Sequence, residues 1–136
     1  MGSSYMITEK DLSIYRLEQA EQCLKSAKTL FTTGDFKGAA NRSYYCVFHS
    51  MRSLLALEGK DFFKHSGVIS HFRKTYIKTN VFDITLSDIL DGLFGVRAES
   101  DYNDFYSISE EEIIEQINNA EFFFDCISKY LKNEQY

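Results

Sequence analysis

The chain has 136 residues, of which 44% are hydrophobic and 26% charged, with a formal net charge of −5 at pH 7. These values are typical of one globular domain and exclude an extended basic nucleic-acid-binding domain. Proline is absent and only seven glycines occur, so long helices are favoured over a fold of strands and turns.

The first two predicted helices are separated by a clear stop signal. Leu12, Tyr15 or Arg16, Gln19, Cys23, Ala27 and Leu30 recur at three- and four-residue steps, which predicts a helix from Thr8 or Asp11 to Thr32. Gly34 follows as a C-terminal stop, and Asp35 can cap a second helix. That helix runs from Phe36 to about Glu58, where Gly59 ends it.

Three further helices are expected in the second half of the chain. A shorter helix covers about residues 68–78, and a fourth begins at Thr85 or Asp88 and reaches Tyr102. Gly92 and Gly95 weaken that fourth helix and could let another helix approach closely. Ser109 and Glu112 have the spacing of a capping box and start the last helix, which runs towards the C-terminus.

These elements predict an all-α fold, an antiparallel four- to five-helix up-and-down bundle that forms a single domain over residues 1–136. We expect residues 1–7 to lie outside the fold, as a disordered or tag-derived extension. The polar start carries no secretory leader, and no apolar run approaches the ~20 residues that span a bilayer. A cytoplasmic protein without a membrane partner is therefore expected.

The cysteines and the charges narrow the class further. Cys23, Cys46 and Cys126 are odd in number and widely spaced, which indicates free thiols rather than a disulfide framework or a zinc site. Residues 1–80 carry 12 Lys/Arg against 7 Asp/Glu, whereas residues 81–136 carry 3 against 13. The molecule could therefore have a basic and an acidic side. These sides could be two solvated faces, a surface for a charge-complementary partner, or a basic half that faces RNA.

The second helix has two different faces. Its apolar face is predicted to be core and consists of Ala40, Tyr44, Val47, Phe48, Met51, Leu54 and Leu55. Arg42 and His49 lie within about 20° of each other on the opposite side, near Cys46 and flanked by Tyr45. This second face could pack on another helix, form a subunit interface, or hold a reacting or ligand-binding pair.

Two other segments carry candidate residues. Lys64 and His65 beside Gly67 could form either an anion-binding corner or a helix-capping turn. His65 and His71 are six residues apart and point to different helix faces, so no metal site is expected. Arg97 and Asp101 can form a salt bridge next to Tyr102, or this cluster could bind a phosphate or position a partner.

The segments "AANRSYYCVFHSMRSLLALEG", "KHSGVISHF" and "VRAESDY", in this order and spacing, resemble the small stand-alone prokaryotic branch of the HEPN domains. The resemblance covers roughly residues 10–130. It implies a homodimeric helical bundle without a cofactor, in many relatives encoded beside a small nucleotidyltransferase-like antitoxin. Active members are metal-independent ribonucleases with an Arg-x4–6-His motif.

The resemblance places the motif arginine at Arg97, but the expected histidine positions hold Tyr102, Asn103 and Asp104. Arg97, Asp101 and Tyr102 follow instead an R-x-x-x-D-Y variant and are the candidate catalytic residues. Arg42 and His49 match Arg-x6-His on a different helix, which we interpret as a coincidence of sequence.

The leading hypothesis is a component of a toxin–antitoxin or nucleotidyltransferase-partnered system, in which Arg42, Tyr45, His49, Lys64 and His65 help to bind RNA or a nucleotide. The alternative is a non-catalytic dimeric interaction module.

Overall fold

The computed structural model describes residues 6–136, and residues 1–5 of the predicted extension lie outside this described part. The described chain is all-α, as predicted, and contains no strand. Its helices are α1 (Glu9–Thr32), α2 (Phe36–Leu57), α3 (His65–Phe72), α4 (Thr85–Tyr102) and α5 (Glu110–Tyr130). Two π-helical turns, η2 (Arg73–Ile77) and η3 (Leu131–Gln135), continue α3 and α5.

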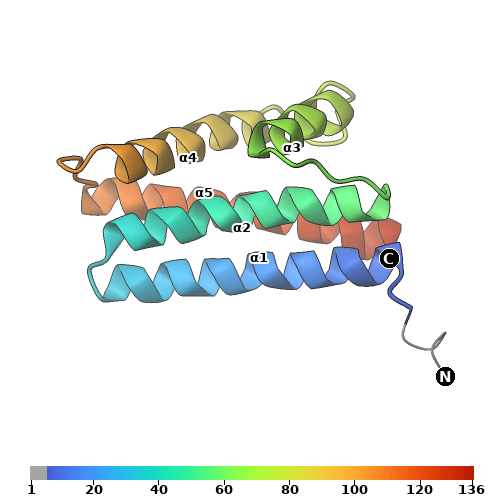
Figure 1. Cartoon of the computed structure of the whole chain (residues 1–136), viewed down its shortest axis with the longest axis horizontal. Coiled ribbons are helices and arrows are strands. Elements are labelled where there is room, and N and C mark those ends of the chain that lie inside the picture. The colour runs from blue at the N-terminus through green and yellow to red at the C-terminus, as the bar shows by residue number, and fades with distance from the viewer. Residues whose placement is uncertain (1–5) are drawn as a thin grey trace.

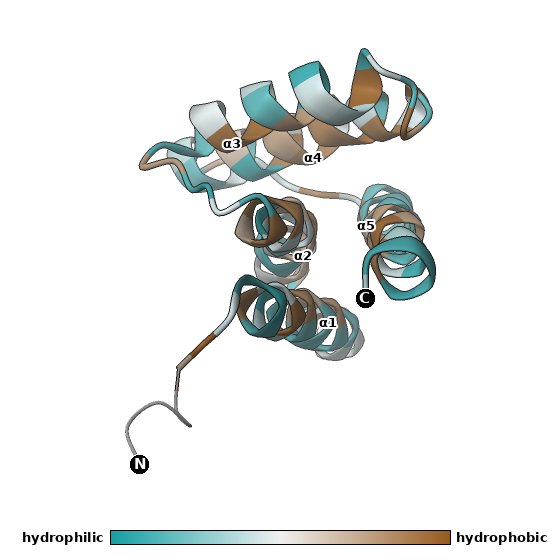
Figure 2. Ribbon diagram, turned by 90° about the vertical axis from the view of Figure 1, so that its right-hand side faces the viewer, coloured by the Kyte–Doolittle hydropathy of each residue, from teal (hydrophilic) through white to brown (hydrophobic). Residues whose placement is uncertain are grey.

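The four long helices form an antiparallel bundle in which α1 begins and α5 ends at the same end (Figure 1). Seen along the bundle, α3 and α4 form a layer on one side of α2, α1 lies on the other side, and α5 lies beside α2 (Figure 2). Helix α2 contacts each of these four helices and is therefore the centre of the fold. Within residues 6–136, no helix has the combination of length and hydropathy that a membrane-spanning segment needs.

The helix ends follow the predicted signals. Gly34 and Gly59 end α1 and α2 with φ values of 83° and 68°, in the left-handed region that favours glycine. The Asp35 side chain accepts a hydrogen bond of 2.9 Å from the Gly38 N–H at the start of α2. Ser109 and Glu112 form the predicted capping box of α5.

The predicted apolar face of α2 is buried along its whole length. A second stripe of α2 is also buried, and it consists of small residues with 0% exposure: Ala39, Ser43, Cys46, Ser50 and Ser53. Ser50 and Ser53 donate their hydroxyl hydrogens to carbonyls within α2, at 2.8 and 2.6 Å, so their burial leaves no donor unpaired. Small side chains let two helices approach closely, which accounts for the extensive contact between α1 and α2.

The sequence did not identify the buried face of α1, and one packing possibility that it raised is not realised. The buried side of α1 contains Ser13, Leu17 and Ala20, whereas Tyr15, which the helical spacing offered as an alternative to Arg16, is 56% exposed. A hydropathy pattern misses this stripe because alanine and serine contribute little to it. Helix α4 continues through Gly92 and Gly95, but a Cβ at either position would meet no atom within 4 Å, so no helix approaches there.

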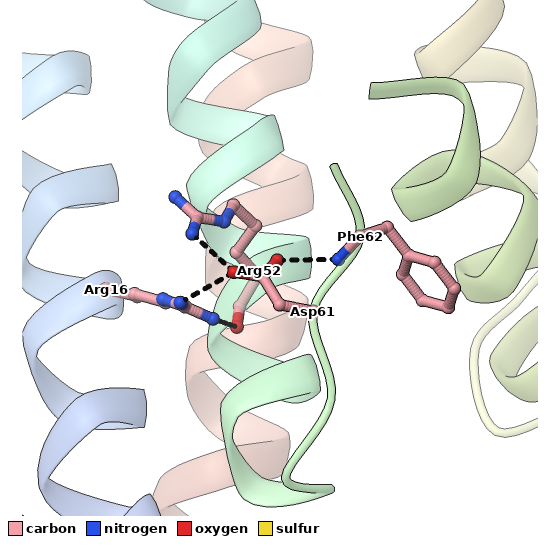
Figure 3. Close-up of polar contacts among 4 residues, drawn as sticks. All are labelled: Arg16, Arg52, Asp61 and Phe62. Atoms are coloured by element: carbon pink, nitrogen blue, oxygen red, sulfur yellow. Dashed lines mark hydrogen bonds and ion pairs between the residues drawn. The ribbon is translucent and has the colours of Figure 1, made fainter. Parts of the chain in front are cut away.

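The connection between α2 and α3 is held by one carboxylate (Figure 3). Asp61 forms ion pairs with Arg16 of α1 at 3.1 Å and with Arg52 of α2 at 2.9 Å. Its other oxygen accepts a hydrogen bond from the Phe62 N–H at 2.9 Å. Arg16 also donates to the Arg52 carbonyl at 3.1 Å, so the loop is tied to both helices. This attachment fixes the chain that leads into α3.

Replacing Asp61 with asparagine is expected to lower the free energy of unfolding by about 1 kcal/mol, because two arginines lose their shared counter-charge. Burial alone would raise the pKa of Asp61, but hydrogen bonds from Arg52 and Phe62 and the charges of both arginines outweigh it and lower the pKa. The contribution is therefore present above the ordinary aspartate pKa and is lost as the pH falls through the lowered value. Urea unfolding at neutral pH measures the effect, and equal stability of both proteins would contradict it.

Candidate functional site

A cluster of cationic and aromatic side chains surrounds Tyr45 of α2. The guanidinium groups of Arg42 and Arg97 lie 5.2 and 5.6 Å from the centre of the Tyr45 ring. The rings of His49 and His65 lie 6.0 and 5.9 Å from the same centre. We call these five residues and Tyr44 the Tyr45 cluster. It joins α2, α3 and α4 in one site.

Arg97 connects α4 to both tyrosines of α2. Its guanidinium lies 4.9 Å from the centre of the Tyr44 ring, and its Nη2 donates a long hydrogen bond of 3.5 Å to the Tyr45 hydroxyl. Its Nε lies 3.1 Å from an Asp101 carboxylate oxygen, which is an ion-pair distance, but the donor is not aimed well enough to form a hydrogen bond. Guanidinium N–H groups that are weakly bound in this way can be offered to a phosphate.

His65, the first residue of α3, is held by a hydrogen bond to α2. Its Nδ1 lies 3.0 Å from the hydroxyl of Tyr44, and its ring centre lies 4.0 Å from that of Phe48. Burial, followed by the positive charges of Arg97 and Arg52, lowers the pKa of His65. Burial also raises the pKa of Tyr44 to about 12. At neutral pH the site therefore contains a neutral imidazole beside a neutral phenol.

His49 is also neutral, and one of its nitrogens is unused. Burial, reinforced by the charges of Arg52, Arg42 and Arg16, lowers its pKa to about 4. Its Nδ1 is buried and has no hydrogen-bond partner within the described residues. A buried polar atom without a partner is uncommon and costs stability, so it often marks a site that is completed by another molecule.

His49 is expected to make the protein less stable in mild acid. An ordinary histidine in the unfolded chain has a pKa near 6.5. Between this pH and about 4, position 49 therefore binds a proton in the unfolded chain but not in the folded protein. Stability should therefore fall as the pH decreases from about 6.5 to about 4. Replacing His49 with glutamine should reduce this fall, which urea unfolding at pH 7 and pH 5 would measure. An unchanged difference between the two pH values would contradict the assignment.

The predicted site residues divide into two groups. Arg42, Tyr45, His49, His65 and Arg97 come together in the Tyr45 cluster, with Asp101 at its edge. Lys64 and Tyr102 do not join them, because Lys64 is an exposed N-cap without a side-chain bond and Tyr102 is 85% exposed. His71 bonds Glu58 at 2.8 Å, away from His65, and no group of metal-ligating side chains occurs within residues 6–136.

For the second face of α2, the structure confirms one of the alternatives left open by the sequence, packing on another helix. Cys46 and Ser53 are buried against neighbouring helices, whereas Arg42 and His49 are half-buried at the edge and contact Tyr45. Arg42 donates to its neighbour Asn41 at 2.8 Å, so it is partly satisfied within its own helix. The Arg-x6-His spacing therefore brings both residues to one site, although their role there stays a prediction.

Sequence reasoning missed one member of the Tyr45 cluster, Tyr44, and also the adjacent Phe48. Tyr44 and Phe48 were assigned to the core, and they are indeed 1% and 6% exposed. Their ring positions nevertheless hold Arg97 and His65 in place. Only the packing of α3 and α4 on α2 reveals this, because His65 and Arg97 lie on helices other than the one that carries Tyr44 and Phe48. The sequence offers no signal for it beyond the neighbouring tyrosines.

The chain is similar to known proteins over most of its length. The family model of the HEPN domain matches residues 14–130. A UPF0332 protein of Thermotoga maritima is 33% identical over 92% of this chain and 94% of its own length. Two proteins of Methanocaldococcus jannaschii that carry the name "Putative toxin" are 30% and 34% identical, each over 85% of this chain, and over 78% and 86% of their own lengths.

The family match covers nearly the whole bundle, including all six residues of the Tyr45 cluster. The likeness also extends over most of the length of these relatives. This agrees with the three quoted segments, which lie on α2, α3 and α4 and meet at the Tyr45 cluster. The chain belongs to the HEPN domain family.

Proposed function

We propose that this protein is the toxin component of a prokaryotic two-protein system and that it binds single-stranded RNA through the Tyr45 cluster. Two relatives named as toxins support the first part. The observation that carries the second part is the arrangement of Arg42 and Arg97 at the Tyr45 ring, at 5.2 and 5.6 Å, with two neutral histidines beside it.

The chemistry of the cluster suits an RNA chain better than a duplex. Guanidinium groups bind phosphates, and both guanidinium planes and tyrosine rings can stack with unpaired bases. The ring of the neutral His49 is half-buried, and a neutral imidazole can accept a hydrogen bond, for which a ribose hydroxyl is a suitable donor. The net charge of −5 argues against an extended grip on a duplex, so a small local site is favoured.

We include no cleavage step in this proposal. The positions at which the family resemblance places the histidine hold Tyr102, Asn103 and Asp104, and Tyr102 points into solvent with 85% exposure. The two imidazoles of the Tyr45 cluster come from α2 and α3 instead. Recognition of RNA, rather than its hydrolysis, is therefore the function that the site supports best.

The proposal is tested by titrating a fluorescein-labelled single-stranded oligoribonucleotide and following its anisotropy. Tyr45→Leu should weaken binding by about 1–3 kcal/mol, the usual contribution of one stacked base. Tyr15→Leu is a matched control, because Tyr15 is an exposed tyrosine on α1 outside the cluster. Equal binding by wild type and Tyr45→Leu would contradict the proposal, as would equal binding of a blunt RNA duplex.

A second candidate is a dimeric interaction module, which the exposed aromatic residues favour. Phe63 is 102% exposed in the α2–α3 connection, and Phe105 is 97% exposed after α4. Large apolar side chains in this state commonly contact another protein. We propose a homodimer, and a nucleotidyltransferase-like antitoxin as the partner protein. Light scattering at micromolar concentration should give twice the chain mass, and a monomer would contradict the homodimer.

A further inference from the structure

A pocket of about 580 Å³ lies between α3–η2 and α4, apart from the exposed edge of α2 that carries Arg42 and His49. Its apolar lining comes from Ile69, Leu90 and Phe94. Leu90 is buried at 2% exposure, whereas Phe94 is 45% exposed. The Phe94 side chain therefore offers an apolar surface that a ligand can contact. Pockets of this size are large enough to hold several side chains of a bound peptide.

Positive charge gathers along one wall of this pocket. Arg73, Lys74 and Lys78 line it, and Asp91 is the only lining carboxylate. Lys74 and Lys78 are exposed and form no ion pair within the described residues, whereas Arg73 pairs with Asp91 at 2.6 Å. The two lysines therefore leave an excess of positive charge at the rim, although the chain as a whole is acidic.

The π-helical turn η2 builds this wall. The Lys78 N–H donates to the Arg73 carbonyl at 2.9 Å, five residues back, which places the two residues on successive turns. Such turns are rare and occur frequently at functional sites. Arg73 is fixed by bonds to Ser87, from Nε to the hydroxyl at 2.9 Å and from Nη2 to the carbonyl at 3.2 Å. Arg73 is thus held by bonds to α4, whereas the side chains of Lys74 and Lys78 are exposed.

We infer that this pocket, which we call the trough, is a docking site for an acidic segment of a partner protein. An aromatic or branched apolar side chain of that segment would pack on Phe94, and its carboxylates would pair with Lys74 and Lys78. The charges do not converge as a single phosphate would require, because the lysines lie at the exposed rim and Arg73 already bonds Ser87 and Asp91. Dispersed charge around an apolar floor complements a peptide with spaced carboxylates.

The trough is separated from the Tyr45 cluster by one aromatic side chain. Phe94 packs against Tyr44 with ring centres 6.2 Å apart. Tyr44 in turn contacts Arg97 through its ring and His65 through its hydroxyl. A substitution at Phe94 would therefore disturb both places. The lysines are the better probes, because they line the trough without contacting the cluster.

The test uses a short fluorescein-labelled peptide of glutamate, leucine and phenylalanine, and a peptide in which alanine replaces both apolar residue types. Wild type should bind the first peptide more tightly than the second. The double variant Lys74→Glu with Lys78→Glu should weaken that binding by at least about tenfold, because attraction becomes repulsion at both rim positions. The variant Lys25→Glu with Lys129→Glu makes the same change of charge at exposed positions elsewhere and should bind like wild type.

Three results would overturn this inference: equal binding of the two peptides, equal loss in the control variant, or displacement of the peptide by adenosine monophosphate in wild type. The last result would show that the trough takes a small phosphorylated molecule. RNA binding by the Lys74→Glu and Lys78→Glu variant should stay within about twofold of wild type, apart from general charge effects that the control variant shares. The docking site and the proposed RNA function can therefore fail separately.

Discussion

Replacing Arg97 with alanine is expected to weaken the binding of single-stranded RNA by at least about tenfold, because a bidentate phosphate donor and its stacking plane are both lost. Arg97 is the one member of the Tyr45 cluster that α4 contributes, and it contacts the rings of Tyr44 and Tyr45 at 4.9 and 5.6 Å. Its removal also leaves Asp101 without its ion-pair partner, so negative charge at the site increases. Fluorescence anisotropy with a labelled oligoribonucleotide measures the effect.

Arg97→Lys separates the two causes. Lysine keeps the charge but has neither the plane nor the fork of donors, so an intermediate loss of affinity is expected. Lys25→Ala is the control for the loss of one positive charge from an exposed position. Unfolding curves for each variant show whether the fold is intact. Wild-type affinity in a folded Arg97→Ala protein would show that RNA does not use the cluster.

Replacing Phe123 with alanine is expected to lower the free energy of unfolding by about 3–5 kcal/mol, which is the usual cost of emptying a buried aromatic site. Phe123 on α5 has 0% exposure, and its ring centre lies 5.4 Å from that of Phe72 on α3. It therefore fastens α5 to the layer that carries His65 and Arg97. A domain of this size is stable by only about 5–15 kcal/mol, so the variant should be close to unfolding.

The neighbouring Phe122 provides a matched control, since it is the same residue on the same helix but is 51% exposed. Phe122→Ala should change the free energy of unfolding by less than about 1 kcal/mol. Urea unfolding followed by circular dichroism at 222 nm, a standard helical band, compares the two. Similar stability losses in both variants would contradict the placement of the two side chains.

The helices and most of their ends could be predicted from the sequence because they depend on local chemistry. Gly34, Asp35, Gly59 and the Ser109–Glu112 pair act on their own chain neighbours, and all four signals agree with the structure. The buried side of α1 did not follow, because Ser13 and Ala20 pack closely without a strong hydropathy pattern. Local signals therefore define where the helices begin and end. Which small side chains of a helix become buried depends instead on the helix that packs against it.

The candidate site shows the same division. Arg42, Tyr45 and His49 share a helix face, so their proximity could be predicted from helical geometry. That Arg97 and His65 join them could not be predicted, because their meeting depends on how α3 and α4 lie across α2. The isolated positions of Lys64 and Tyr102 have the same cause. Adjacency in the chain to His65 and Asp101 does not bring them into the cluster.

Ultraviolet cross-linking of a bound single-stranded oligouridine to the unmodified protein, followed by peptide mass spectrometry, tests most directly whether RNA binds at the Tyr45 cluster. Aromatic residues stacked on bases are the ones expected to react, so cross-links should fall on Tyr45 and on the peptide that contains Arg97. Cross-links confined to exposed aromatics outside the cluster, such as Phe63 or Phe105, would contradict the claim that RNA binds at the Tyr45 cluster.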